Sequence, residues 1–222
     1  MQWLKMGLDF ELQENIISVL VLENQSIYTE FMRELLQTVD GGENAFVLYD
    51  NEKKMNVSKT VEVIFSPMLL DMNSKRIQQY LFSELKGLSD EIGYEKKERI
   101  NTEVVDYLDL LSQKIPFPIR FKLELDEALL YKQYDVRIEY EEELLLEKVI
   151  NYIQIQSVLC GTKVLIFINI KAYFTDEQLQ EIYKSAFYNK IYLILLENNN
   201  RNCMYEEKYY IIDRDKCLIT HD

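Results

Sequence analysis

The chain has 222 residues and a formal net charge of −13 at pH 7. Its composition, 48% hydrophobic and 12% aromatic, is typical of a folded globular protein and excludes long disordered segments. The negative charge repels nucleic acid and anionic lipid at long range, so any binding to nucleic acid requires a segregated basic surface.

The N-terminal part alternates strand and helix signals. Ile16 to Leu22 is an apolar run rich in β-branched residues, which predicts a buried strand. Ser26 is a suitable N-cap for a helix from Ile27 to Thr38, whose apolar residues recur at helical spacing. Two further strands are expected at Ala45 to Tyr49 and at Val61 to Phe65.

The pattern becomes mainly helical after Asp71. Asn73 or Ser74 caps an expected helix that ends near Gly87, and a charged link (YEKKER, Tyr94 to Arg99) leads to a second helix, Ile100 to Gln113. Phe121 to Leu125 alternates like a short strand, and Asp126 caps a brief helix. We read residues 71–137 as a helical insertion in an α/β head made of residues 1–70 and 138–222.

The clearest sequence signal for a secondary-structure element lies in the C-terminal part of the chain. Val164 to Ile168 is an unbroken apolar run, typical of a central parallel strand that is covered on both faces. Thr175 and Gln178 then form a capping box for a following helix. A long helix before this strand and three strands after it complete an α/β fold: Glu141 to Leu159, Ile191 to Leu196, Tyr209 to Ile212 and Cys217 to Thr220.

Several function classes are excluded by composition. The single histidine, His221, stands next to the C-terminus, which argues against Ser-His and Cys-His catalysis and against histidine-based metal sites. The three cysteines show no CxxC pairing, so we expect a reduced, cytoplasmic chain without structural zinc. No apolar run reaches the ~18 residues of a membrane span, and the N-terminus lacks the apolar core of a signal peptide.

The order of strands and helices resembles that of P-loop NTPases, but the phosphate-binding residues are missing. No glycine or lysine stands between Leu22 and Ile27, and Glu23 would repel a phosphate. Asn169 follows the later strand at the place where an aspartate would hold Mg²⁺. We therefore expect neither nucleotide binding nor nucleotide hydrolysis.

One acidic cluster has the residue types of a divalent-metal site. Glu124, Asp126 and Glu127 place three carboxylates within four positions, close to Lys122 and Lys132. Oxygen-rich clusters of this kind suit Ca²⁺ or Mg²⁺, and two-metal nucleases use them. A solvated surface, a structural ion and a catalytic site are all compatible with this pattern.

Five stretches together resemble the accessory spacer-acquisition protein of type II-A CRISPR loci, in the same order and at similar distances along nearly the whole chain. They are VLVLENQSIYTEFMRELL, SPMLLDMNSKRI, ELDEALLYKQYDVRIE, KVLIFINIKAYFTDEQLQEI and CLIT. The resemblance implies a degenerate P-loop-like α/β head with a helical extension. It also implies a homotetrameric ring that holds double-stranded DNA ends, works with the adaptation integrase and the RNA-guided effector nuclease, and has no enzymatic activity.

The resemblance further implies calcium binding at Glu124, Asp126 and Glu127. This sequence departs from the family pattern at Lys122 and Lys132, where further carboxylates are expected, and a lysine ammonium there could supply part of the positive charge of the ion. The DNA-contacting lysines have no tight motif. Clustering alone gives the candidates Lys53, Lys54, Lys59, Arg120, Lys122 and Lys132. A divalent-metal nuclease and a protein-only scaffold of the adaptation complex are the alternative functions.

Overall fold

The chain divides into two compact units. The computed structural model describes residues 1–42, 45–50, 53–140, 144–199 and 203–221. Unit 1 consists of Met1–Met72 and Tyr140–Asp222, and unit 2 of Asn73–Glu139. Each boundary lies two residues after the one expected from the sequence. No helix in the described residues is both long enough and apolar enough to cross a membrane.

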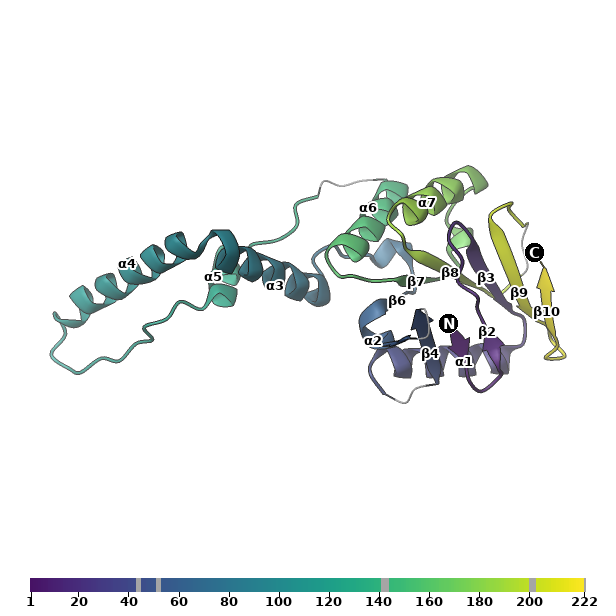
Figure 1. The fold of residues 1–222 in the computed structure, drawn as a ribbon, viewed down its shortest axis with the longest axis horizontal. Helices are drawn as coiled ribbons and strands as arrows, with labels where there is room; N and C mark the ends of the chain where they lie inside the picture. Colours follow the sequence, from purple (N-terminus) through teal and green to yellow (C-terminus); the bar gives the residue numbers. More distant parts are fainter. Residues whose placement is uncertain (43–44, 51–52, 141–143, 200–202, 222) are drawn as a thin grey trace. The chain divides into compact units, whose positions relative to one another are not determined.

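Unit 1 is built on a six-stranded sheet, and the α/β prediction is confirmed. The order of its strands is β10-β9-β3-β8-β7-β6, in which β10 is antiparallel to β9 and the other pairs are parallel. Helices α6 and α7 cover one face of the sheet and α1 lies on the other (Figure 1). The strands are β3 (Ile17–Leu22), β6 (Val61–Ile64), β7 (Val164–Ile168), β8 (Tyr192–Glu197), β9 (Glu207–Ile212) and β10 (Leu218–His221).

Unit 1 contains four α-helices in the described residues, two of which begin with a side-chain cap. They are α1 (Gln25–Val39), α2 (Val57–Thr60), α6 (Leu145–Val158) and α7 (Asp176–Tyr188), with 3₁₀ turns η1 (Pro67–Leu69) and η2 (Ile170–Ala172). The predicted capping box of α7 is confirmed, because Thr175 and Gln178 exchange side-chain to backbone hydrogen bonds. The prediction of Ser26 as a cap is wrong. The side chain of Asn24 accepts bonds from two backbone N–H groups, so α1 begins earlier. The first residues of the expected helix from Glu141, residues 141–143, lie outside the described residues.

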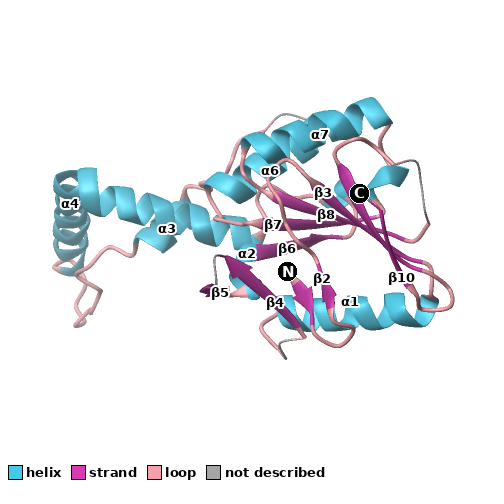
Figure 2. Cartoon of the chain, turned by 45° about the vertical axis from the view of Figure 1, so that its right-hand side comes forward, coloured by secondary structure: helices cyan, strands magenta, loops and turns pink. Residues whose placement is uncertain are grey.

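A second, antiparallel sheet packs beside α1 (Figure 2). Its order is β2-β1-β4-β5, and its strands are β1 (Gln2–Trp3), β2 (Leu8–Asp9), β4 (Phe46–Asp50) and β5 (Lys53–Met55). Trp3 lies edge-on to Phe31 of α1 and stacks on Phe46 of β4, at ring-centroid distances of 5.1 and 6.0 Å. This aromatic cluster joins the small sheet to α1 and so positions β5.

Unit 2 is helical, as predicted, but two of its boundaries differ from expectation. Its helices are α3 (Lys75–Ile92), α4 (Tyr94–Ser112) and α5 (Glu127–Gln133). The expected end near Gly87 and the expected link at 94–99 are both wrong, because α3 continues to Ile92 and α4 starts directly after Gly93. Residues 121–125 form no strand, since unit 2 has no other strand to pair with them.

The two ends of unit 2 are joined by one side chain. The amide of Asn73 donates to the carbonyl of Ile138 at 2.9 Å and accepts from the N–H of Ile138 at 2.8 Å. Ser74, as expected, then caps α3 by accepting from the backbone of Ile77. The first and last residues of unit 2 therefore lie side by side in space.

Candidate functional site

The three carboxylates of the acidic cluster do not converge in unit 2. Asp126 is the N-cap of α5, and its side chain accepts from the N–H of Leu129 at 3.1 Å. Glu127 begins α5 and is buried, whereas Glu124 is exposed on the segment before the helix. Among the residues that the structure describes, no group of three histidine, cysteine, aspartate or glutamate side chains could hold a metal ion. The donor set as placed therefore does not fit Ca²⁺, which takes six to eight oxygen ligands.

A lysine that the sequence analysis did not single out holds the buried carboxylate. The ammonium of Lys97, on the first turn of α4, lies 3.0 Å from Oε2 of Glu127 and 2.8 Å from Oδ1 of Asp90 on α3. The Tyr131 hydroxyl donates to the other carboxylate oxygen of Glu127 at 3.2 Å. One ammonium thus links all three helices of unit 2.

The hydrogen bonds of this cluster shift the pKa values of Glu127 and Lys97. Burial would raise the pKa of Glu127, but hydrogen bonds from Ser89, Lys97 and Tyr131 outweigh it and hold the pKa below its ordinary value. Hydrogen bonds to Asp90 and Glu127 raise the pKa of Lys97 in turn. Around neutral pH the lysine is therefore cationic and both carboxylates are anionic.

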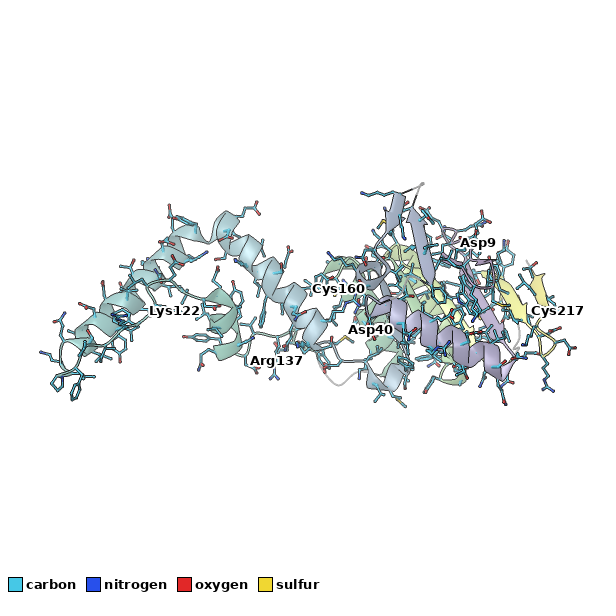
Figure 3. The ribbon with its side chains drawn as sticks, turned by 90° about the horizontal axis from the view of Figure 1, so that it is seen from below. Asp9, Asp40, Lys122, Arg137, Cys160 and Cys217 are labelled. Carbon is cyan, nitrogen blue, oxygen red and sulfur yellow. The ribbon has the colours of Figure 1, made fainter. Side chains whose placement is uncertain are left out.

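The remaining lysines around this site make it more cationic than the sequence cluster predicts. An open groove in unit 2 is lined by Lys86, Lys97 and Lys122 as well as by Glu124 and the residues that begin α5. Lys122 lies on the segment between α4 and α5 (Figure 3). Lysines and carboxylates interleave here, so the groove is not a purely acidic pocket.

The six candidate DNA-binding residues are all exposed, but they belong to different units. Lys53 and Lys54 lie on β5 and Lys59 lies in α2, all in unit 1. Arg120, Lys122 and Lys132 lie in unit 2. The structure brings Lys53 and Lys54 together as neighbours on one strand, opposite Asp50 and Tyr49 of β4.

A P-loop protein holds phosphate at the start of the helix that follows the first strand of its parallel sheet. In this chain, side chains of the protein itself bind the backbone at that position. The first N–H groups of α1 donate to the side chain of Asn24, whose amide donates to the carbonyl of Arg214. Asn169, at a φ of 53°, accepts from the N–H of Asn198, and Glu197 is buried at the end of β8. Two of the N–H groups at the start of α1, those of Ser26 and Ile27, thus already have a partner, and a buried carboxylate lies at this edge.

A buried polar network next to this edge was also missed by sequence reasoning. The Lys171 ammonium donates to both carboxylate oxygens of Glu207 and, at 2.7 Å, to the hydroxyl of Tyr209. The Tyr183 hydroxyl donates to Glu207 at 2.5 Å. Burial, together with the Glu207 carboxylate, raises the pKa of both tyrosines. Each group has a partner, as a structural ion pair requires.

One family model and two relatives to which the chain is similar carry the same family name. A family model described as "CRISPR-associated protein (Cas_Csn2)" matches residues 38–216. A protein named "CRISPR-associated protein Csn2" from Streptococcus agalactiae is 23% identical over 208 residues, covering 91% of this chain and 90% of the relative. One of the same name from Enterococcus faecalis is 23% identical over 180 residues, covering 77% of this chain and 80% of the relative.

Among solved structures, the chain is similar to an ATP-binding cassette of an ABC transporter in its ADP conformation. The TM-score is 0.41 at 10% identity, with 96% of this chain and 82% of that chain covered. A likeness of this size carries no argument about function.

Proposed function

Because the chain belongs to the Cas_Csn2 family of CRISPR-associated proteins, we propose that it acts in CRISPR spacer acquisition as a non-catalytic ring that holds the ends of double-stranded DNA. The family match over residues 38–216, which covers all of unit 2 and much of unit 1, carries this proposal. The ring consists of four copies of the chain and works beside the adaptation integrase and the RNA-guided effector nuclease.

The charge distribution supports binding through an enclosed basic surface. A chain with a net charge of −13 repels DNA unless its lysines are gathered where the acids are not. Lys53 and Lys54 are exposed neighbours on β5 and are suited to contact phosphates. Phosphate contacts carry no sequence information, so binding is independent of base sequence.

The apolar surface of α4 supports assembly from several copies. Ile100, Val104, Tyr107 and Leu111 recur at helical spacing on one side of α4, and each is exposed by more than 40% of its surface. No residue of this helix is buried within the chain. An exposed apolar stripe of this length is typical of a protein interface, and another copy of the chain is the partner that the proposal requires.

The test compares one plasmid in two forms. The protein is incubated with relaxed closed circles and with the same molecule linearised, in chelator, in Ca²⁺ and in Mg²⁺. Binding that is tighter to the linear form, falls with salt and leaves the DNA uncut supports the ring, because a ring needs an end to thread and phosphate contacts are screened. Equal binding to both forms refutes threading, and cleavage refutes a non-catalytic role. Absence of binding would leave the protein-only scaffold.

A further inference from the structure

We propose that the ammonium of Lys97 is a built-in cation of unit 2, which joins α3, α4 and α5 and makes the stability of this unit independent of calcium. The proposal concerns the fold of unit 2 and does not depend on DNA binding or on the ring. It rests on the position of one ammonium between two carboxylates from different helices.

The geometry gives Lys97 the role of a bridging ion. Asp90 lies near the end of α3, and Glu127 is the first residue of α5. Lys97 contacts both, at 2.8 and 3.0 Å, from the first turn of the helix between them. A lysine ammonium has three donors and no acceptor, so a single side chain can hold two carboxylates at once. Helix α5 has seven residues, of which only Glu127 is buried, and its Tyr131 ring packs against Phe82 of α3 at a centroid distance of 5.5 Å.

The buried carboxylate requires a positive partner. The side chain of Glu127 is 8% exposed, and a buried anion is stable only when it is paired and hydrogen-bonded. Lys97 supplies the charge and Tyr131 an additional hydrogen bond to Glu127. The charge of Glu127 is therefore balanced inside unit 2 without any ion from solution.

The same contacts disfavour a calcium ion. A divalent cation that bound Glu127 would lie next to the Lys97 ammonium and near Lys86 and Lys122, which line the same groove. Asp126 already accepts a backbone hydrogen bond as the cap of α5. Calcium would have to displace an internal cation and a helix cap in order to gather its oxygen ligands. Of the two lysines at which the sequence departs from the family pattern, Lys122 lines this groove, but the ammonium that holds the carboxylates is that of Lys97.

The experiment measures amide hydrogen exchange in peptides from α3, α4 and α5 of the full chain, with β7 and β8 of unit 1 as an internal reference. The wild-type protein should exchange at the same rate in chelator and in millimolar Ca²⁺. Lys97→Met should speed exchange in α5 about tenfold, because it leaves Glu127 buried without its cation, while Lys97→Arg should remain close to wild type. Lys96→Met is the matched control, since Lys96 is the exposed neighbour on the same turn.

A third variant tests whether the position is a cation site. Lys97→Glu places a third carboxylate between Asp90 and Glu127, so exchange in α5 should be fast in chelator and should slow on addition of Ca²⁺. Lys96→Glu, with the same charge change, should show no such response. Slower exchange of the wild-type protein in Ca²⁺ would overturn the proposal, as would a Lys97→Glu variant that ignores the ion. If Lys97→Met does not fold, the response of the wild-type protein to Ca²⁺ decides the question alone.

Discussion

The ammonium of Lys171 lies 2.6 and 2.7 Å from the two carboxylate oxygens of Glu207, and both side chains are buried in unit 1. The pair connects η2, which follows strand β7, to the first residue of β9. The N–H of Met204 also donates to Glu207, at 2.9 Å, and so do Tyr183 and Tyr209. Lys171 follows the carboxyl end of β7, whereas Glu207 is in register with Ile17, the first residue of β3, so the pair connects two ends of the sheet.

Replacing Lys171 by methionine should lower the free energy of unfolding by about 3–5 kcal/mol, because it leaves Glu207 as an unpaired buried charge. Urea unfolding measures the change. Lys184→Met, at an exposed lysine of α7, is the control and should be close to neutral. In the double variant Lys171→Met with Glu207→Gln, the loss should be smaller than the sum of the two single losses. A loss below about 1 kcal/mol for Lys171→Met would contradict the importance of the pair.

Tyr183 should make the stability of unit 1 fall at alkaline pH. Burial and the Glu207 carboxylate raise the pKa of Tyr183 far above its ordinary value of 10.0, so the folded protein keeps a proton that the unfolded chain releases. Its contribution is therefore fully present below pH 10 and decreases above it, by up to about 1.4 kcal/mol per pH unit. Urea unfolding at a series of pH values measures this slope.

The variant Tyr183→Phe isolates the contribution. It should be less stable than wild type at neutral pH by about 1.5–3 kcal/mol, the value of a hydrogen bond to a charged group, and its stability should fall less steeply with alkaline pH. Tyr188→Phe, at a position on the same helix that is 88% exposed, should retain both the wild-type stability and the wild-type slope. The same slope in wild type and Tyr183→Phe would show that another group controls the alkaline loss.

The elements that could be predicted from the sequence are those with local signals. The apolar run Val164 to Ile168 and the capping box of Thr175 with Gln178 are contained in short stretches, and both are confirmed. Strands β1 and β2 have two residues each, too few to show alternation. Their positions follow from the packing of Trp3 against Phe31 and Phe46, which no local pattern reveals.

The polar contacts could not be predicted because their partners are far apart in sequence. Lys171 and Glu207 are separated by 36 positions, and neither stands in a recognisable motif. Lys97 lies in the charged stretch 94–99, which was predicted to be a link between helices but forms the first residues of α4. The weak N-cap at Gly93 explains that error, since it gives no side-chain capping bond. The sequence did mark Glu127 and the neighbouring lysines as one region, but not which ammonium pairs with it.

The exposed stripe on α4 should control assembly. Val104→Glu together with Leu111→Glu places two charges on the apolar side of this helix, so the proposed tetramer should break into smaller species while unit 1 stays folded. Light scattering measures the mass, which for the wild-type protein should be four times that of one chain. Thr102→Glu, on the opposite side of α4, should leave the mass unchanged. A double variant with the wild-type mass would place the interface elsewhere.

Neutralising Lys53 and Lys54 on β5 should weaken binding of linear DNA of any sequence. Lys53 is paired in register with Asp50, so glutamine is preferable to glutamate, which would set like charges opposite each other in the sheet. Each lysine that contacts a phosphate contributes about 0.9 to the slope of log affinity against log salt. The double variant should therefore bind less tightly at low salt, with a slope shallower by up to about 1.8.

The control for this variant is the double substitution Lys184→Gln with Lys190→Gln, which removes the same charge from two other exposed lysines of unit 1. Fluorescence anisotropy of an end-labelled duplex at several salt concentrations measures both affinity and slope. If the two double variants lose affinity equally, only the net charge matters and β5 does not face the DNA. If the Lys53 and Lys54 variant alone loses affinity, and by the same factor on unrelated sequences, β5 contributes to the phosphate-binding surface of the proposed ring.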